Sequence, residues 1–190
     1  MEKIILASQS PRRRELLHLA EINFDIIVAN TDESYHDSLS FEDTAVHIAK
    51  NKALVVAENN AGKIILAADT IVVCNNKILG KPIDREDAIA ILSQLSDNTH
   101  QVITGVCILK KEHEICFADI TTVSFHALTK DQITYYIDKY KPYDKAGAYA
   151  IQEWIGAVGI KRIDGDFYNV MGLPVSRVVT ALNSLGNFDM

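Results

Sequence analysis

Asp69 is a single carboxylate in the middle of the apolar run Ile64–Cys74. The run is short and rich in β-branched residues, and it ends at the turn-like pair Asn75-Asn76, so it predicts a buried strand. A carboxylate in such a strand loses its hydration and must pair with a cation, bind a metal ion or take up a proton. The structural alternative is a carboxylate at a sheet edge, where the strand emerges and the side chain caps a loop.

The segment Ser8–Arg14 places two hydroxyls and three arginines directly after a short apolar stretch. Pro11 suits the first position of a helix, because its missing N–H has no helical partner there. Backbone N–H groups at a helix start, together with hydroxyls and guanidiniums, are suited to bind phosphate. Helix geometry turns Arg12, Arg13 and Arg14 to different faces, so at most two of them can serve one ligand. The alternative is an ordinary helix start with solvated arginines.

Lys52 lies on the apolar face of the helix expected over Phe41–Glu58. It follows Ile48 by four residues and precedes Val56 by four, which places the three side chains on one stripe. The remaining members of the stripe are Ala45, Ala49 and Ala53. Such a lysine either extends along the protein to reach solvent or points into a cleft that holds an anion.

Three further polar segments carry groups that suit a nucleotide. Lys81 is stiffened by the following proline, although an ordinary turn is the simpler interpretation. Glu33 stands in an acidic loop and is by default solvated; opposite a phosphate site it would complete a Mg²⁺ or Mn²⁺ centre with Asp69. The segment Asp144–Gln152 combines a charge pair, a glycine and an amide, and the amide of Gln152 can read a base edge through a donor and an acceptor.

The elements that must position these groups alternate between strand and helix, which predicts a mixed α/β fold with one dominant sheet. The expected strands cover residues 3–7, 24–28, 64–74, 77–79, 102–110, 115–125 and 157–163. The expected helices cover about residues 11–19, 41–58, 84–95, 129–139 and 174–183, with N-caps at Ser40 (a capping box with Asp43), Asp84 and Thr129. Residues 165–174 are expected to form a glycine-rich loop.

Composition limits the classes of protein to which the chain can belong. A chain of 190 residues can form one substantial core and is just long enough for two lobes. Its net charge of −6 argues against general nucleic-acid binding. No apolar stretch reaches the roughly 20 residues of a membrane span, and the N-terminus lacks the apolar core of a signal peptide. The three cysteines lack metal-ligand spacing, so we expect reduced thiols in a cytoplasmic protein.

Taken together, these segments resemble the Maf family of nucleoside triphosphate pyrophosphatases. The matching pieces occur in family order from residue 4 to about residue 180, so the resemblance covers nearly the whole chain. The pieces are Ser8-Gln9-Ser10-Pro11-Arg12-Arg13, Asp32-Glu33, Lys52-Ala53, Ala68-Asp69-Thr70, Gly80-Lys81-Pro82, His100–Val106, Asp144–Tyr149 and Tyr168–Pro174. One mild departure is Lys50, at or near which the family has an arginine.

The resemblance implies a fold and an activity. The fold is α/β, a single Maf-like domain over residues 1–190, with a central mixed, twisted sheet flanked by helices and two lobes around a deep cleft. The activity is that of a hydrolase of nucleotide metabolism, which cleaves between the α and β phosphates and releases pyrophosphate. The stretch through Gln152 resembles the branch that acts on dTTP and UTP rather than the branch that acts on 7-methyl-GTP.

The resemblance also implies roles for individual residues. Asp69 would accept the proton of the attacking water, and Asp69 with Glu33 would hold Mg²⁺ or Mn²⁺. The substrate-binding residues would be Ser8, Arg13, Lys52, Lys81 and Lys145 for the triphosphate, and Arg12, Thr70 and Gln152 for the choice of base. The expected partner is the nucleoside triphosphate, with no nucleic acid or membrane, and the family suggests a homodimer.

Two other readings of function stay open at this point. The first is a nucleotide-binding regulator of septum formation that has no enzymatic activity, and it would release no pyrophosphate. The second keeps the reaction and changes the substrate to inosine triphosphate, xanthosine triphosphate or 7-methyl-GTP.

Overall fold

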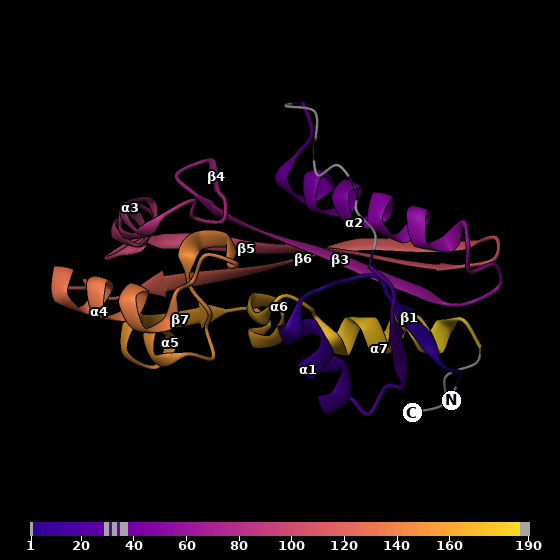
Figure 1. The fold of residues 1–190 in the computed structure, drawn as a ribbon. Coiled ribbons are helices and arrows are strands. Elements are labelled where there is room, and N and C mark those ends of the chain that lie inside the picture. The colour runs from indigo at the N-terminus through magenta and orange to yellow at the C-terminus, as the bar shows by residue number, and fades with distance from the viewer. Residues whose placement is uncertain (1, 29–30, 32–33, 35–37, 187–190) are drawn as a thin grey trace. The chain divides into compact units, whose positions relative to one another are not determined.

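The computed structural model describes residues 2–28, 31, 34 and 38–186 of the chain (Figure 1). Over these residues it is a mixed α/β protein built on a seven-stranded sheet, in the order β2-β1-β3-β5-β6-β7 with β4 paired to β3. The strands are β1 Ile4–Leu6, β2 Phe24–Ile26, β3 Ile65–Cys74, β4 Lys77–Leu79, β5 Thr99–Lys110, β6 His113–Phe125 and β7 Ile160–Asp164. The helices are α1 Pro11–Leu19, α2 Phe41–Ala57, α3 Arg85–Leu95, α4 Lys130–Tyr140, the 3₁₀ turn η1 Ala146–Ala148, α5 Trp154–Gly159, α6 Phe167–Met171 and α7 Val175–Ser184.

Local signals placed most helix starts correctly. Ser10, Ser40, Asp84 and Thr129 are all N-caps whose side chains accept a backbone N–H three residues on. Only Thr129 has the reciprocal capping box, with Gln132 as its partner. The box expected at Ser40 takes another form, because its hydroxyl donates to the Asp43 carboxylate at 2.7 Å.

Two expected elements were wrong. Residues 157–159 belong to α5 rather than to a strand, because Ile155 and Gly159 are buried with the four-residue spacing of a helix. Residues 167–171 form the short helix α6 rather than a loop. The Asp166 carboxylate accepts the N–H of Tyr168 at 2.8 Å, which stabilises the start of this helix.

Strand β3 is an interior strand of the sheet, with β1 on one side and β5 on the other. It pairs in parallel with β1 (Ile5 with Ile65, Leu6 with Leu66) and antiparallel with β4. Asp69 sits in the middle of β3, so the alternative of a carboxylate at a sheet edge is excluded.

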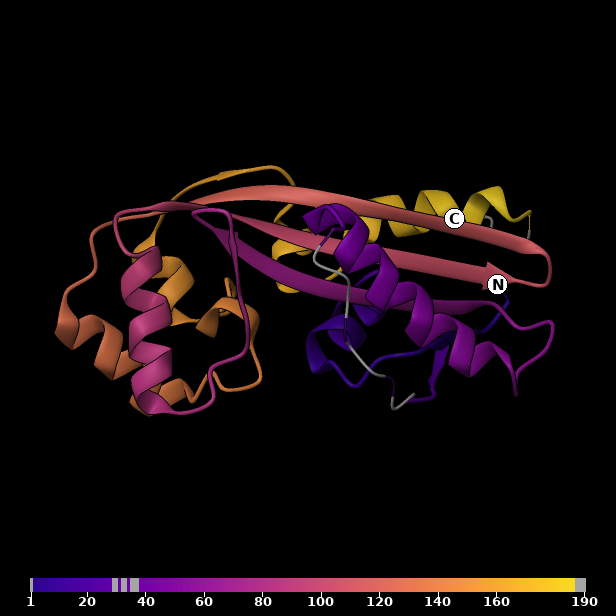
Figure 2. The same cartoon turned by 90° about the horizontal axis from the view of Figure 1, so that it is seen from above.

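The chain divides into two compact units, each with its own apolar core. The first comprises residues 1–69, 104–119 and 172–190, and the second comprises residues 70–103 and 120–171. In the first unit, α2 lies on one face of the strands and α1 and α7 lie on the other (Figure 1). Figure 2 shows α2 lying across these strands. The core of this face includes Ala49, Ala53 and Val56 of α2 and Cys107 and Leu109 of β5.

Gly105 allows α2 to approach β5 closely. A Cβ at this position would lie 2.2 Å from the backbone carbon of Ala45, so only glycine fits. The contact fixes the distance of α2 from the strand beneath it.

The second unit packs α3 against α4 and against η1. Its core includes Leu92 and Leu95 of α3, Tyr136 and Ile137 of α4, and Ile155 of α5. None of the helices in the described part of the chain combines the length and the apolar character that crossing a bilayer requires.

Candidate active site

Lys52 and Asp69 form an ion pair inside the first unit. Lys52 Nζ lies 2.7 Å from Asp69 Oδ1, and the two side chains keep only 14% and 15% of their exposure. Lys52 therefore does not extend to solvent but points from α2 to the strand below. The pair explains how a carboxylate is tolerated within β3, because its charge is compensated by a hydrogen-bonded ammonium.

The Ser8–Arg13 loop is cross-linked by hydrogen bonds. Ser8 Oγ accepts from the backbone N–H of Ser10 at 3.2 Å and from Arg13 Nη1 at 3.0 Å. Arg13 Nε donates to the carbonyl of Gly172 at 2.8 Å. Arg13 is buried, whereas Arg12 and Arg14 are half-buried, so α1 does turn its three arginines into different environments.

The parallel register of β1 and β3 brings this loop near Asp69. Leu6 of β1 pairs with Leu66 of β3. Ser8 follows Leu6 by two residues, and Asp69 follows Leu66 by three residues. The carboxyl end of a parallel strand is where α/β sheets place ligand-binding loops. The first unit thus gathers a hydroxyl, a guanidinium, an ammonium and a carboxylate around the end of β1.

The second unit holds a buried lysine. Lys145 is 8% exposed, and its ammonium lies 2.7 Å from Asp144 Oδ1 and 3.6 Å from Glu153 Oε1. The Tyr136 hydroxyl donates to Glu153 and accepts the N–H of Ala150 at 3.2 Å. These contacts fix the turn that carries Gln152, whose side chain is exposed.

Glu153 and Tyr136 were missed by the sequence analysis. The signal for Tyr136 was its place on the buried face of α4, because a buried phenol needs a hydrogen-bond partner. Glu153 alone, in a turn, gives no such signal.

The Lys81 turn and the Lys145 loop are joined within the second unit. Gly147 N donates to the carbonyl of Gly80 at 3.1 Å. Gly147 has a φ of +69°, and a Cβ there would meet Val72 at 2.9 Å, so glycine is required. Lys81 itself is exposed.

Thr70 directly follows Asp69 in β3. Side chains alternate along a strand, so Thr70 in β3 points to the face opposite that of Asp69. Glu33 lies outside the described residues. Within the described part of the chain, no group of three His, Cys, Asp or Glu side chains could hold a metal ion. A metal ion at Asp69 would therefore take further ligands from elsewhere, as Mg²⁺ commonly does from water and substrate phosphates.

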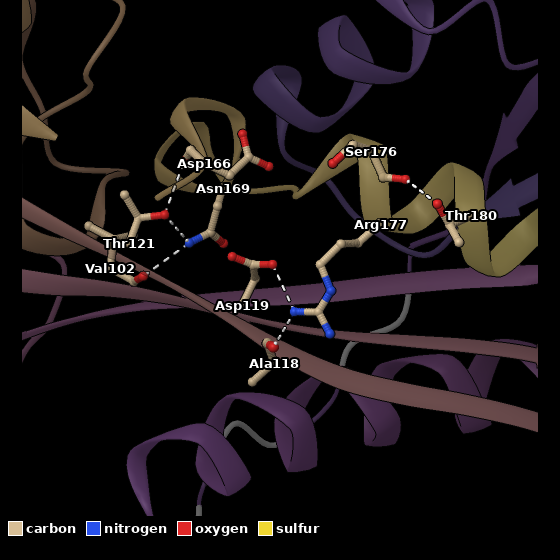
Figure 3. A network of polar contacts seen from close by, with 9 residues as sticks. All are labelled: Val102, Ala118, Asp119, Thr121, Asp166, Asn169, Ser176, Arg177 and Thr180. Carbon is tan, nitrogen blue, oxygen red and sulfur yellow. Dashed lines mark hydrogen bonds and ion pairs between the residues drawn. The ribbon is translucent and has the colours of Figure 1, made fainter. Parts of the chain in front are cut away.

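Asn169 has a structural role in the second unit (Figure 3). The Asn169 side chain is fully buried, and its Nδ2 donates to the carbonyl of Val102 at 3.1 Å and to Thr121 Oγ1 at 3.0 Å. The Thr121 hydroxyl donates in turn to the carbonyl of Asp166 at 3.0 Å. These bonds hold α6 against the sheet strands of this unit.

A separate contact in Figure 3 attaches α7 to β6 in the first unit. Arg177 Nη1 donates to the carbonyl of Ala118 at 2.7 Å and to the Asp119 carboxylate at 2.8 Å. Its guanidinium also lies 4.2 Å from the ring centre of Phe117. These contacts attach α7 to β6. They thereby help to position the segment that precedes α7, which begins at Gly172, the hydrogen-bond acceptor of Arg13.

The family model described as Maf-like protein matches residues 3–185. The chain belongs to the Maf family. It is 48% identical over 182 residues to a dTTP/UTP pyrophosphatase of Parabacteroides distasonis, covering 95% of this chain and 94% of the relative. It is 50% identical over 187 residues to a dTTP/UTP pyrophosphatase of Cytophaga hutchinsonii, covering 98% and 86%. The resemblance stated from the motifs is thereby confirmed.

The Maf chain shares its fold with Ham1 proteins. The Ham1 protein of Coxiella burnetii superposes with a TM-score of 0.53 at 13% identity, covering 97% of this chain and all of that chain. The Ham1 protein of Staphylococcus aureus gives a TM-score of 0.52 at 14% identity, covering 98% and 100%. At such low identity these likenesses concern the fold alone, and they agree with the expected α/β class.

Proposed function

We propose that this Maf protein hydrolyses dTTP and UTP between the α and β phosphates, giving the nucleoside monophosphate and pyrophosphate. The observation that carries the proposal is the Lys52–Asp69 ion pair, 2.7 Å long and largely shielded from solvent, near the phosphate-suited Ser8–Arg13 loop. The choice of dTTP and UTP is supported by the relatives that bear that name at 45–50% identity.

Asp69 is the proposed proton acceptor. The ion pair with Lys52 engages Oδ1, and we assign Oδ2 to the attacking water. A carboxylate held in one orientation can take the water proton as the water approaches the α-phosphate. Lys52, with Ser8 and Arg13, stabilises the negative charge of the phosphates.

The proposed cofactor is Mg²⁺ or Mn²⁺, bound by Asp69 and by Glu33, which lies outside the described residues. One or two carboxylates together with phosphate oxygens are the ligand set that Mg²⁺ prefers. When bound, such an ion neutralises phosphate charge and polarises the bond to be broken.

The remaining predicted residues are assigned by their motifs. Lys81 and Lys145 are proposed to bind phosphate, and Arg12, Thr70 and Gln152 to set base choice. A hydrogen-bonding base site can reject a wrong base strongly, since each unpaired buried polar group costs about 1–3 kcal/mol. Residues 1–190 are proposed to act as a single Maf domain.

The proposed setting follows from the substrate. A hydrolase of nucleoside triphosphates works where these nucleotides are made and used, so we propose a cytoplasmic protein. We also propose a homodimer, and light scattering of the purified protein would give its mass. We propose that the protein binds neither nucleic acid nor membranes. The net charge of −6 supports the first of these two proposals.

The decisive experiment compares kcat/KM for pyrophosphate release across dTTP, UTP, inosine triphosphate, xanthosine triphosphate and 7-methyl-GTP, with Mg²⁺ and with Mn²⁺. We expect dTTP and UTP to lead by at least tenfold, with nucleoside monophosphate formed in equal amount. Lack of pyrophosphate from every triphosphate would favour a non-enzymatic regulator, and preference for a purine would overturn the substrate assignment.

A further inference from the structure

The hairpin of β5 and β6 places two cysteines directly opposite each other. Its two strands are joined by the two-residue turn Lys111-Glu112. Cys107 lies three residues before the last residue of β5, and Cys116 lies three residues after the first residue of β6. Counting outward from the turn therefore pairs Cys107 with Cys116.

Contacts at the far end of the hairpin give the same register. The hydroxyls of Thr99 and Ser124 are 2.9 Å apart, and each lies eight residues from its cysteine. The N–H of Phe125 donates to the carbonyl of Asn98 at 2.9 Å, one step further out. The pairing counted from the turn and the pairing given by these contacts follow the same register, so no net register shift occurs between them.

The same contacts define the kind of pair that the cysteines form. Hydrogen-bonded and non-hydrogen-bonded pairs alternate in an antiparallel ladder. Asn98 and Phe125 form a hydrogen-bonded pair, and each lies nine residues along the chain from Cys107 or Cys116. Because nine is odd, Cys107 and Cys116 occupy a non-hydrogen-bonded pair. Cα atoms in such pairs are about 4.5 Å apart, which falls within the roughly 4.4–6.8 Å that a disulfide spans.

The two thiols already contact each other, and they differ in exposure. Cys107 is fully buried in the core with Ala49 and Ala53 of α2, whereas Cys116 is half-buried. A hydrogen bond from the Cys107 thiol lowers the pKa of Cys116, and the same bond, together with burial, raises the pKa of Cys107. Burial and the Glu114 carboxylate oppose the Cys116 thiolate, whereas the Lys50 ammonium, paired with Glu114 at 2.6 Å, favours it.

We propose that Cys107 and Cys116 are a reversible dithiol–disulfide site that takes up two-electron oxidants of the peroxide class. The Cys116 sulfur attacks hydrogen peroxide, the O–O bond breaks, and a sulfenic acid and one water form. The Cys107 sulfur then attacks the sulfenic sulfur, the S–O bond breaks, and the disulfide and a second water form. The two sulfurs together lose two electrons, and the peroxide gains them. This site is separate from the proposed hydrolase function and does not depend on it.

Cys74 provides an internal comparison. It is buried in the second unit, where its thiol donates to the carbonyl of Gln94 and accepts from Asn98 Nδ2. Burial raises its pKa. Cys107 and Cys116 both belong to the first unit, so Cys74 has no second cysteine in its own unit to act as a resolving thiol.

The test treats the full-length protein with a modest excess of hydrogen peroxide, alkylates the remaining thiols and maps the peptides by mass spectrometry. We expect Cys107 and Cys116 to be linked within one chain, the alkylatable thiols to fall from three to one, and dithiothreitol to restore all three. Recovery of both cysteines in alkylated form, or links between chains in their place, would overturn the proposal.

Single variants separate the roles of the two sulfurs. Cys107→Ala should stop at a Cys116 sulfenic acid, which dimedone traps, and Cys116→Ala should keep both remaining thiols reduced. The matched control Cys74→Ala should form the disulfide as the parent does. A disulfide that disappears in Cys74→Ala would contradict the assigned pair. The mapping of the parent protein decides the proposal alone if a variant does not fold.

Discussion

Lys52 Nζ lies 2.7 Å from Asp69 Oδ1, and the two side chains come from different elements, α2 and β3. A pair that is nearly closed to solvent interacts more strongly than an exposed one. Here a lysine that is out of place on an apolar helix face compensates a carboxylate that is out of place in an apolar strand.

Replacing either member of this pair should remove most of the turnover. We expect Asp69→Asn and Lys52→Met each to lower kcat by about 10²–10⁴-fold, the range of a positioned acid–base group. The double variant should lose little more than the worse single variant, because the two side chains act together. Single-turnover kinetics with dTTP would measure this. Asp164→Asn, which is 69% exposed, serves as the control. Full additivity would show that the two residues act independently.

Arg13 should matter for both substrate binding and local stability. Arg13→Lys keeps the charge but loses the planar fork that joins Gly172 to Ser8. We expect KM to rise by about tenfold and unfolding to become easier by about 1–3 kcal/mol. Steady-state kinetics and urea unfolding would test this, with the exposed Arg162→Lys as control. An unchanged KM would assign Arg13 to structure alone.

Gly105→Ala should destabilise the protein strongly. A Cβ there would lie 2.2 Å from the Ala45 backbone, so α2 or β5 must shift. We expect a loss of about 2–4 kcal/mol in the free energy of unfolding. The matched control is Gly80→Ala, where no atom lies within 4 Å of the added Cβ and where φ is not positive. Equal stability of the two variants would show that α2 adapts at no cost.

His100 should make stability fall in acid. It is buried and bonded through Nε2 to the Tyr149 hydroxyl, and burial lowers its pKa from 6.5 to about 4. Below pH 6.5 the unfolded chain binds a proton that the folded chain refuses, so stability decreases until pH 4 and then levels off. The decrease attributable to this histidine is about 3 kcal/mol.

The measurement for His100 compares unfolding free energies of the parent and of His100→Gln between pH 4 and 7. The variant should show a shallower slope, whatever its absolute stability, because glutamine does not titrate. Equal slopes in this range would mean that His100 does not remain neutral in the folded protein.

Glu153 and Tyr136 should act through Lys145. Tyr136→Phe removes the donor to Glu153 and the acceptor of Ala150 N, which loosens the turn that carries Gln152. We expect the KM for dTTP to rise by several-fold, with kcat less affected. The ratio of kcat/KM for dTTP to kcat/KM for inosine triphosphate should therefore decrease. In Glu153→Gln the side chain can still accept a hydrogen bond from the Tyr136 hydroxyl, so its KM for dTTP should rise less than that of Glu153→Ala. Glu86→Gln, whose side chain is 79% exposed, is the control.

Features that depend on neighbouring residues could be predicted from the sequence, whereas contacts between distant residues could not. The N-caps at Asp84 and Thr129 depend on residues three positions away and were correctly predicted. Lys52 and Asp69 were each conspicuous, because a charge within an apolar pattern conflicts with its surroundings. Their contact could not be derived from the pattern, because it needs α2 placed on the correct face of β3.

Other parts of the site were hidden because they fit their local context. Glu153 is an ordinary turn residue until Tyr136 is seen to bind it, and the two lie on separate elements. The segment Ala157–Gly159 is apolar enough for a strand, and only the burial of Ile155 with Gly159 favours the helix. Tertiary packing decided both cases.

The first unit is assembled from three separate stretches of chain, and this affects the order in which it can form during synthesis. Arg13 and its acceptor Gly172 are separated by 159 positions. As the chain leaves the ribosome, α1 and its loop are made early but cannot complete this contact until residue 172 emerges. The second unit needs no residue beyond 171, so its segments are all available sooner. The first unit, which holds the Lys52–Asp69 pair, is therefore expected to mature last, after nearly all of the chain has been translated.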